Sequence, residues 1–252
     1  DEIKYGIEAI GFSTDFETFN PLGYVVSQEE NTTELGAFVT YRYSKGKIIL
    51  EPSFRTQYYS SLSVVSPEPR LGVKFKVNER LRLKGAAGIY SQNLIAANSD
   101  RDIVNLFYGF LASPQNLQDD FVQSDGSVKE VTNPLQKANH LILGFEFDIT
   151  EKLNLNIEGY VKDFSQVTNT NRNKLFPDNP DYNHIPDVLR KDFIVESGKA
   201  KGVDFVLKFE EKSTYVWFVY SLGDVDRWDG FQTYDPIFDR RHNINFVATQ
   251  GF

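Results

Sequence analysis

The sequence predicts an all-β protein, an antiparallel sheet of about ten strands that forms a portion of a transmembrane β-barrel. Stretches of alternating apolar and polar residues recur along the chain, and the connections between them are alternately short and long. Because successive side chains of a strand point to opposite faces, each stretch has an apolar face and a polar face. In an outer-membrane barrel the apolar face meets lipid and the polar face lines a wet interior.

Each expected strand combines this period-two alternation with turn-forming residues at its ends. The alternation is regular in 139–149, and the next such stretch, 152–162, follows almost at once, which predicts a hairpin. By the same criterion, strands are expected at 3–12, 33–43, 47–58, 68–77, 80–92, 138–149, 152–165, 199–209, 214–222 and 241–252.

The connections differ between the two ends of the sheet. At one end they are short polar turns, expected at 44–46, 78–79, 150–151 and 210–213. At the other end they are longer and hold most of the prolines and Asn/Asp clusters, and they cover 13–32, 59–67, 93–137, 166–198 and 223–240. Loops beyond about 12–15 residues are uncommon in compact soluble domains. Short periplasmic turns and long extracellular loops are typical of an outer-membrane barrel.

The charged residues of the strands fall on one side. A charge on the lipid face near the midplane costs about 2–4 kcal/mol, so the charged side is expected to face the interior. The expected lipid side comprises Leu35, Ala37, Val39, Tyr41, Tyr43, Leu71, Val73, Phe75, Val77, Leu141, Leu143, Phe145, Phe147, Ile149, Val203, Phe205, Leu207 and Phe209. The opposite side comprises Arg70, Gly72, Lys74, Lys76, Glu146, Asp148, Asn154, Asn156, Glu158, Lys162, Asp204 and Lys208.

The amino-acid composition excludes several classes of function. A formal net charge of −8 argues against nucleic acid as a partner, because nucleic-acid binding needs a basic surface. The chain has no cysteine, which excludes disulfides and thiolate chemistry. No apolar run approaches the roughly 20 residues of a membrane-spanning helix. The 21 Phe and 13 Tyr suit strands and the aromatic girdles of a barrel.

Several segments together resemble the barrel of TonB-dependent outer-membrane receptors. They keep the order and spacing of strands in that family, and they are 66–75 (SPEPRLGVKF), 81–92 (LRLKGAAGIYSQ), 133–140 (NPLQKANH), 158–163 (EGYVKD), 198–205 (GKAKGVDF) and 238–246 (FDRRHNINF). The family barrel has about 22 strands and an N-terminal plug domain, whereas this chain has about ten expected strands and no segment like a plug or TonB-contacting box. Residues 1–252 are therefore expected to be a partial barrel domain, from the middle to late part.

The resemblance implies a receptor in the cell outer membrane of a Gram-negative bacterium that takes up a scarce nutrient. Its implied partners are outer-membrane lipid and lipopolysaccharide, the TonB complex through a plug outside this chain, a small nutrient ligand and a surface lipoprotein. No cofactor is expected. Two alternatives stay open. One is a complete ten-stranded barrel, such as an adhesin, a pore or a rim hydrolase, favoured by the apolar alternation before Phe252. The other is a soluble β protein that binds carbohydrate.

The loops supply the candidate ligand-binding residues, because exposed aromatic side chains are common in binding surfaces. They are Phe107, Tyr108, Phe110, Tyr182, Trp228, Phe231 and Tyr234. A weaker calcium candidate, with enough oxygen atoms but no EF-hand spacing, is formed by Asp178, Asp181, Asn183 and Asp187. His140 and His242 are expected near the extracellular rim. No Gly-x-Ser-x-Gly motif or linked nucleophile and base occurs, so no catalytic residue and no enzyme are predicted.

Overall fold

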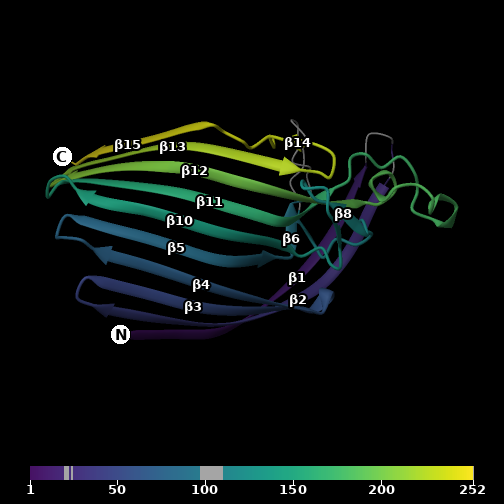
Figure 1. Ribbon diagram of the computed structural model, residues 1–252, viewed down its shortest axis with the longest axis horizontal. Coiled ribbons are helices and arrows are strands. Elements are labelled where there is room, and N and C mark those ends of the chain that lie inside the picture. Colours follow the sequence, from purple (N-terminus) through teal and green to yellow (C-terminus); the bar gives the residue numbers. More distant parts are fainter. Residues whose placement is uncertain (20–22, 24, 97–109, 252) are drawn as a thin grey trace.

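The computed structural model describes residues 1–19, 23, 25–96 and 110–251, and it is an antiparallel all-β fold (Figure 1). Within these residues one large sheet is built from long strands, which are β1 (Glu2–Phe19), β2 (Val25–Lys45), β3 (Ile48–Tyr59), β4 (Val64–Lys76), β5 (Leu81–Gln92), β10 (Gln136–Asp148), β11 (Leu153–Thr170), β12 (Phe193–Glu211), β13 (Thr214–Trp228) and β15 (His242–Gln250). Each lies beside its neighbour in this order, and β13 also pairs with the short β14 (Thr233–Tyr234). The predicted meander of strands is confirmed.

Smaller elements lie between the long strands at the loop end. They are β6 (Leu94–Ala96), β7 (Phe110–Ala112), β8 (Asp120–Val122), β9 (Val128–Glu130) and the 3-10 turns η1 (Ser60–Leu62), η2 (Pro180–Tyr182) and η3 (Asp187–Leu189). In Figure 1 the short turns lie at the left and these elements at the right. No helix among the described residues has the length and apolar character needed to cross a membrane.

Two of the connections predicted to be long are not loops. Most of 13–32 continues β1 and β2, and these strands pair from Glu2–Arg42 to Phe19–Val25. The connection expected at 59–67 shrinks to η1 and Ser63, because β3 and β4 pair as far as Tyr59 and Val64. The prediction missed these extensions because 13–19 and 25–32 carry polar residues on both faces and lack the alternation used to find strands.

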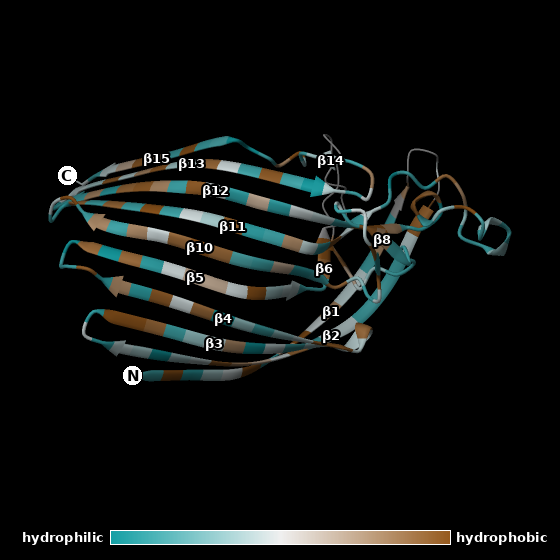
Figure 2. Ribbon diagram, in the orientation of Figure 1, coloured by the Kyte–Doolittle hydropathy of each residue, from teal (hydrophilic) through white to brown (hydrophobic). Residues whose placement is uncertain are grey.

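The register of the sheet joins the apolar positions of successive strands into one apolar face. One row of paired residues crosses eight strands as Ile48, Phe75, Leu83, Phe145, Ile157, Phe205, Tyr220 and Ile244. A second row runs through Leu71, Ala87, Leu141 and Val161. Figure 2 shows the resulting alternation of hydrophobic and hydrophilic residues along each strand. Residues of these rows keep substantial exposure, as with 49% for Leu141 and 64% for Ile244, so this apolar face has no protein cover in the described residues.

The opposite, polar face carries ion pairs that reach over an intervening strand. Lys74 Nζ on β4 lies 2.8 Å from Glu146 Oε2 on β10, although β5 separates these strands. Arg82 on β5 contacts Glu146 at 3.1 Å and Asp148 at 2.7 Å. Lys84 reaches Glu158 on β11 in the same way. The polar face therefore holds its charges in compensated pairs, while the apolar face is free of them over the same height.

The first and last long strands do not pair. In the described part of the chain, β1 bonds only to β2, and β15 bonds only to β13. Figure 1 shows them at the lower and upper margins of the sheet. The expectation that these two strands lie apart, rather than closing a ten-stranded cylinder, is confirmed. Each leaves a row of backbone groups without a strand partner in the described residues.

The hairpin of β1 and β2 projects beyond the sheet and folds over its loop end. Its inward-facing Phe16 and Val26 form a small core with Ile95, Leu111 and Phe193, which come from distant loops and from the start of β12. In Figure 1 the hairpin rises from the lower margin toward these segments. This loop end, where strands and loops converge, is called the mouth below.

The mouth end of the hairpin is also fixed by hydrogen bonds. The amide of Gln28, buried on β2, donates to the carbonyl oxygens of Ala112 and Ser113 at 3.3 and 2.9 Å. Its Oε1 accepts from the backbone N–H of Gln115 at 2.9 Å. A buried amide with all of these partners holds the hairpin in one position against the loop.

A charge on the apolar face is expected to disrupt membrane assembly. Leu143→Arg places a cation on the exposed apolar face and should cost about 2–4 kcal/mol. Asn156→Arg, on the polar face opposite Glu146, should be tolerated. Heat-modifiability of the two variants on a denaturing gel measures this difference. Equal assembly of both would contradict the assignment of the faces to lipid and interior.

The orientation of the sheet can be tested on intact cells, since the chain has no native cysteine. A cysteine at the exposed Asp125, in the β8–β9 turn, should react with a membrane-impermeant maleimide added outside. A cysteine at Lys45, beside a short turn, should react only after the outer membrane is permeabilised. The reverse pattern would place the short turns on the cell surface.

Candidate ligand-binding site at the mouth

A hollow of about 370 Å³ opens in the polar face just below the mouth. It is lined by side chains from five neighbouring strands, among them Arg55 on β3, Arg70 on β4, Tyr90 on β5, His140 on β10 and Phe164 on β11. The register explains why they meet. Arg70 pairs with Gly88, Gly88 pairs with His140, and each strand presents its polar face here at the same height.

Three aromatic rings lie in a row along this hollow, with an arginine at each end of the row. The guanidinium of Arg70 lies 4.4 Å from the centre of the Tyr90 ring, and the Tyr90 ring stacks on His140 with ring centres 4.4 Å apart. His140 meets the Phe164 ring edge-on at 6.3 Å, and Arg227 lies 5.2 Å from Phe164 on the far side. Such contacts hold the rings in place and favour cations beside them.

The absence of a side chain at Gly88 makes this stacking possible. A Cβ at this position would lie 3.0 Å from Arg70 Cγ and from the ring of Tyr90. Because Gly88 has no side chain, Arg70 and the Tyr90 ring can contact each other above β5. This contact of Arg70 with Tyr90 shapes the hollow.

The acidic group that lines the hollow is fully engaged by protein. Glu68 is 1% exposed, and its Oε1 accepts from the backbone N–H and the hydroxyl of Ser91 at 2.9 and 2.7 Å. Its Oε2 accepts from Arg70 at 2.5 Å. The Ser91 hydroxyl is in turn 2.9 Å from the Tyr59 hydroxyl. A buried carboxylate is stable only with such partners, so Glu68 serves as an internal support for Arg70.

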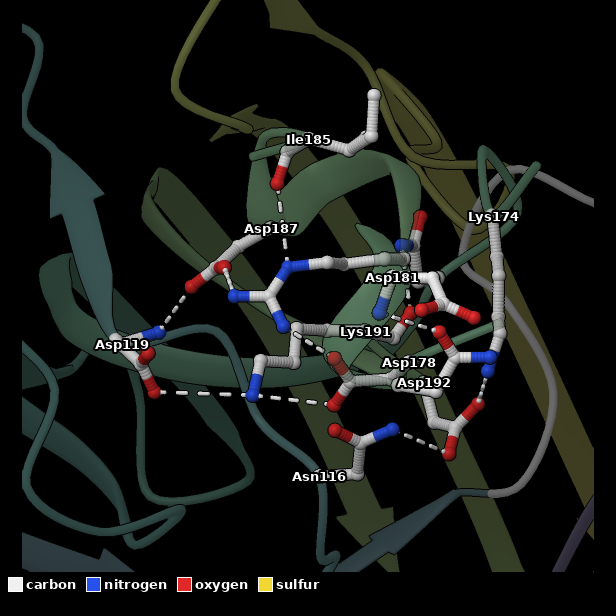
Figure 3. A network of polar contacts seen from close by, with 12 residues as sticks. Asn116, Asp119, Lys174, Asp178, Asp181, Ile185, Asp187, Lys191 and Asp192 are labelled. Carbon is white, nitrogen blue, oxygen red and sulfur yellow. Dashed lines mark hydrogen bonds and ion pairs between the residues drawn. The ribbon is translucent and has the colours of Figure 1, made fainter. Parts of the chain in front are cut away.

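A second polar cluster stabilises the loop between β11 and β12 (Figure 3). Arg190 donates to Asp187 at 2.6 Å and to Asp178, while Lys191 lies 3.3 Å from Asp178. Lys174 pairs with Asp192 at 2.5 Å. Further contacts join this loop to the segment before β8, through Asn116 and Asp119.

The weak calcium candidates are not gathered around a common point by this arrangement. Asp178 and Asp187 both turn to Arg190, and Asp181 and Asn183 are exposed. Within the described residues no group of three or more His, Asp or Glu side chains is placed to hold a metal ion. Asp178, Asp187 and Asp192 of this loop are instead paired with lysine and arginine side chains of the same chain.

The predicted loop aromatics take different places. Phe107 and Tyr108 lie outside the described residues. Phe231 and Phe110 are exposed, at 70% and 63%. Tyr182 packs against Phe176 with ring centres 5.3 Å apart. Two others support the rim, because the Trp228 indole donates to the Val122 carbonyl at 2.8 Å and the Tyr234 hydroxyl donates to the buried Glu196 at 2.7 Å.

The histidines are not brought together. His140 faces the hollow, whereas His242 pairs in register with Leu222 on the apolar face and lies 2.9 Å from the Tyr220 hydroxyl. Sequence reasoning did not identify the hollow, although a signal was present. Counting residues outward from the short turns places Arg70, Gly88 and His140 at one height on the polar face.

Comparison with solved structures shows that the fold is that of a portion of an outer-membrane receptor barrel. A chain of the FpvAI–pyocin S2 complex matches with a TM-score of 0.56 and 11% identity, over 90% of this chain and 27% of that one. The alcaligin outer-membrane receptor FauA from Bordetella pertussis matches with 0.57 and 13%, over 98% and 39%. The RagAB peptide importer matches with 0.53 and 14%, over 94% and 28%.

These neighbours are TonB-dependent outer-membrane receptors and transporters rather than enzymes, and the predicted fold is confirmed. The chain spans between 27% and 39% of their lengths. No model of a known protein family matches the sequence, and no curated protein matches it.

The loop between β11 and β12 should loosen in acid. Burial alone would raise the pKa of Asp178, but hydrogen bonds from Arg190 and Lys191 outweigh it and hold this pKa below the usual range. A lowered pKa contributes stability above the unfolded-state value of about 4, and that stability is lost as the pH falls through the folded-state value. Protection of the Leu175 and Phe176 amides, which bond to the Leu189 carbonyl, should therefore fall below about pH 4.

Hydrogen exchange, corrected for its intrinsic pH dependence, measures this protection. The amides between β10 and β11 serve as the control because their bonds belong to the sheet. Unchanged protection of Leu175 and Phe176 down to pH 3, which is about one unit below the unfolded-state value, would contradict a role for the Asp178 pairs.

Proposed function

We propose that this chain forms part of the barrel of an outer-membrane receptor that takes up a scarce nutrient with energy delivered by TonB. The observation that carries the proposal is the sheet itself, which has one continuous apolar face, one charged face and, in the described residues, two outer strands that each have one unpaired edge. In lipid each unsatisfied backbone group costs several kcal/mol, so these strands need further strands beside them. The fold of the solved receptors supplies a wider barrel of this kind.

The proposed domain assignment follows from that requirement. Residues 1–252 make a partial barrel wall whose polar face looks into the interior, and other parts of the receptor complete the cylinder and carry the contact with TonB. The mouth then faces the medium, with lipopolysaccharide around its outer rim. The exposed Phe110 and Phe231 are placed in this scheme where an arriving ligand or a surface lipoprotein would meet them first.

The small-barrel alternative has less support. A closed ten-stranded barrel requires direct pairing between the first and last strands, and β1 and β15 have none among the described residues. A soluble carbohydrate-binding protein would leave the rows of exposed Leu, Val and Phe on the apolar face in water. The apolar row crosses eight strands, whereas contiguous apolar patches on soluble monomers are rarely larger than a few hundred Å².

Uptake by cells tests the proposal. A strain lacking the gene, its complemented form and a strain lacking TonB should be compared for uptake of labelled nutrients from a panel offered at limiting concentration. We expect at least one nutrient whose uptake falls to background in both mutants and returns on complementation. Uptake that depends on the gene but persists without TonB would identify a passive pore, and unchanged uptake of the whole panel would contradict a transport role.

A further inference from the structure

We infer that the hollow below the mouth binds a small organic anion with a planar, unsaturated body, such as an aromatic polycarboxylate. This inference rests on the proposed function, because it names the class of ligand that the receptor would recognise. Three features of the hollow carry it: the balance of its charges, the planarity of its floor and its size.

The charges that line the hollow are mostly positive. Arg55 on β3 and Arg70 on β4 both lie on the polar face, and Glu68 is the acidic side chain among the described lining residues. Glu68 is buried beneath Arg70 and its oxygens accept bonds from Arg70 and Ser91, so its charge is compensated from within. The side chains of Arg55 and Arg70 keep exposures of 29% and 30%. A ligand entering the hollow therefore meets cations.

The arginines are held in position by protein contacts. Arg70 is fixed by Glu68 below and by the Tyr90 ring beside it. Arg55 donates to Glu8 on β1 at 3.1 Å, across β2. A guanidinium group that protein contacts already fix loses little conformational entropy when it binds a carboxylate. Its planar N–H donors also match the two oxygens of that carboxylate. Cations on separate strands are best matched by a ligand with more than one negative group.

The floor between these cations is made of rings. Tyr90 and His140 stack with an angle of 29° between their planes, and Phe164 stands edge-on beside them. Stacked rings offer a flat surface that favours a flat ligand over a branched or globular one. A volume of about 370 Å³ is within the range of pockets for small molecules. It is far too small for a folded protein.

The test uses the full-length protein purified from outer membranes in detergent, with benzene-1,3,5-tricarboxylate and its neutral triamide as probes. These two molecules share a flat body and differ in charge. Calorimetric titration should show binding of the tricarboxylate that weakens as salt is raised, and binding of the triamide that is about tenfold weaker or undetectable. Equal affinity for the two probes, or no binding of the tricarboxylate, would overturn the inference.

Variants place the binding in the hollow. Arg55→Gln and Arg70→Gln should each weaken tricarboxylate binding about fivefold. Lys76→Gln removes the same charge from the same face of β4, but at its short-turn end, and should bind as the wild type does. Heat-modifiability shows that each variant is folded. Because Arg70→Gln also removes a partner of Glu68, Arg55, which pairs with the exposed Glu8 instead, provides the independent measurement. Unchanged binding in folded Arg55→Gln and Arg70→Gln would overturn the assignment to the hollow.

Failure of this inference and failure of the proposed function give different results. Binding by the purified protein does not require TonB. Loss of the preference for the anion, with TonB-dependent uptake intact, would contradict the ligand class alone. Binding of the anion by a protein whose uptake does not depend on TonB would contradict the proposed mode of transport alone.

Discussion

The rest of the structure depends on one constraint, which is that the backbone N–H and C=O groups of each strand must find hydrogen-bond partners on neighbouring strands. The ten long strands meet it by pairing in sequence order, apart from the outer edges of β1 and β15 in the described residues. Short turns at one end make such pairing direct, and they fix the register for the strands on both sides. The register then decides which side chains share a height and a face, so the rows of apolar residues outside and the cations inside follow from the same pairing.

This constraint also explains how much could be predicted from the sequence. Where one face of the sheet is apolar, a shift of one residue would turn Leu143 to the polar face and bring Glu146 or Glu158 to the apolar face, so the alternation must be strict and is visible in the sequence. The expected lipid side matches the register for that reason. Where the sheet has no continuous apolar face, both faces of a strand tolerate polar residues. The extensions of β1 and β2 carry polar residues on both faces, and their pattern resembles that of a loop.

The hollow was harder to predict because its lining residues must share a level along the strands as well as a face of the sheet. Alternation placed Arg70 on the interior side, but it does not give the height of Tyr90 on the next strand or of His140 on β10, which follows a long loop. The pairing of Gly88 with Arg70 and with His140 brings these two residues to one level, and the lack of a side chain at Gly88 lets Arg70 and Tyr90 meet. Among the loop aromatics, Trp228 and Tyr234 use their polar atoms to bond to other parts of the mouth, and ligand binding by the loop aromatics stays a prediction.

The hairpin of β1 and β2 has a consequence for the order in which the protein is assembled. Its base pairs locally and can form as soon as the first 45 residues are available. At its mouth end, however, Phe16 and Val26 are buried against Leu111 and Phe193, which follow them by more than eighty residues of chain. Contacts of such long range form late, because the intervening chain must first be brought together. The earliest strands to form are thus completed last, when the mouth has been built around them.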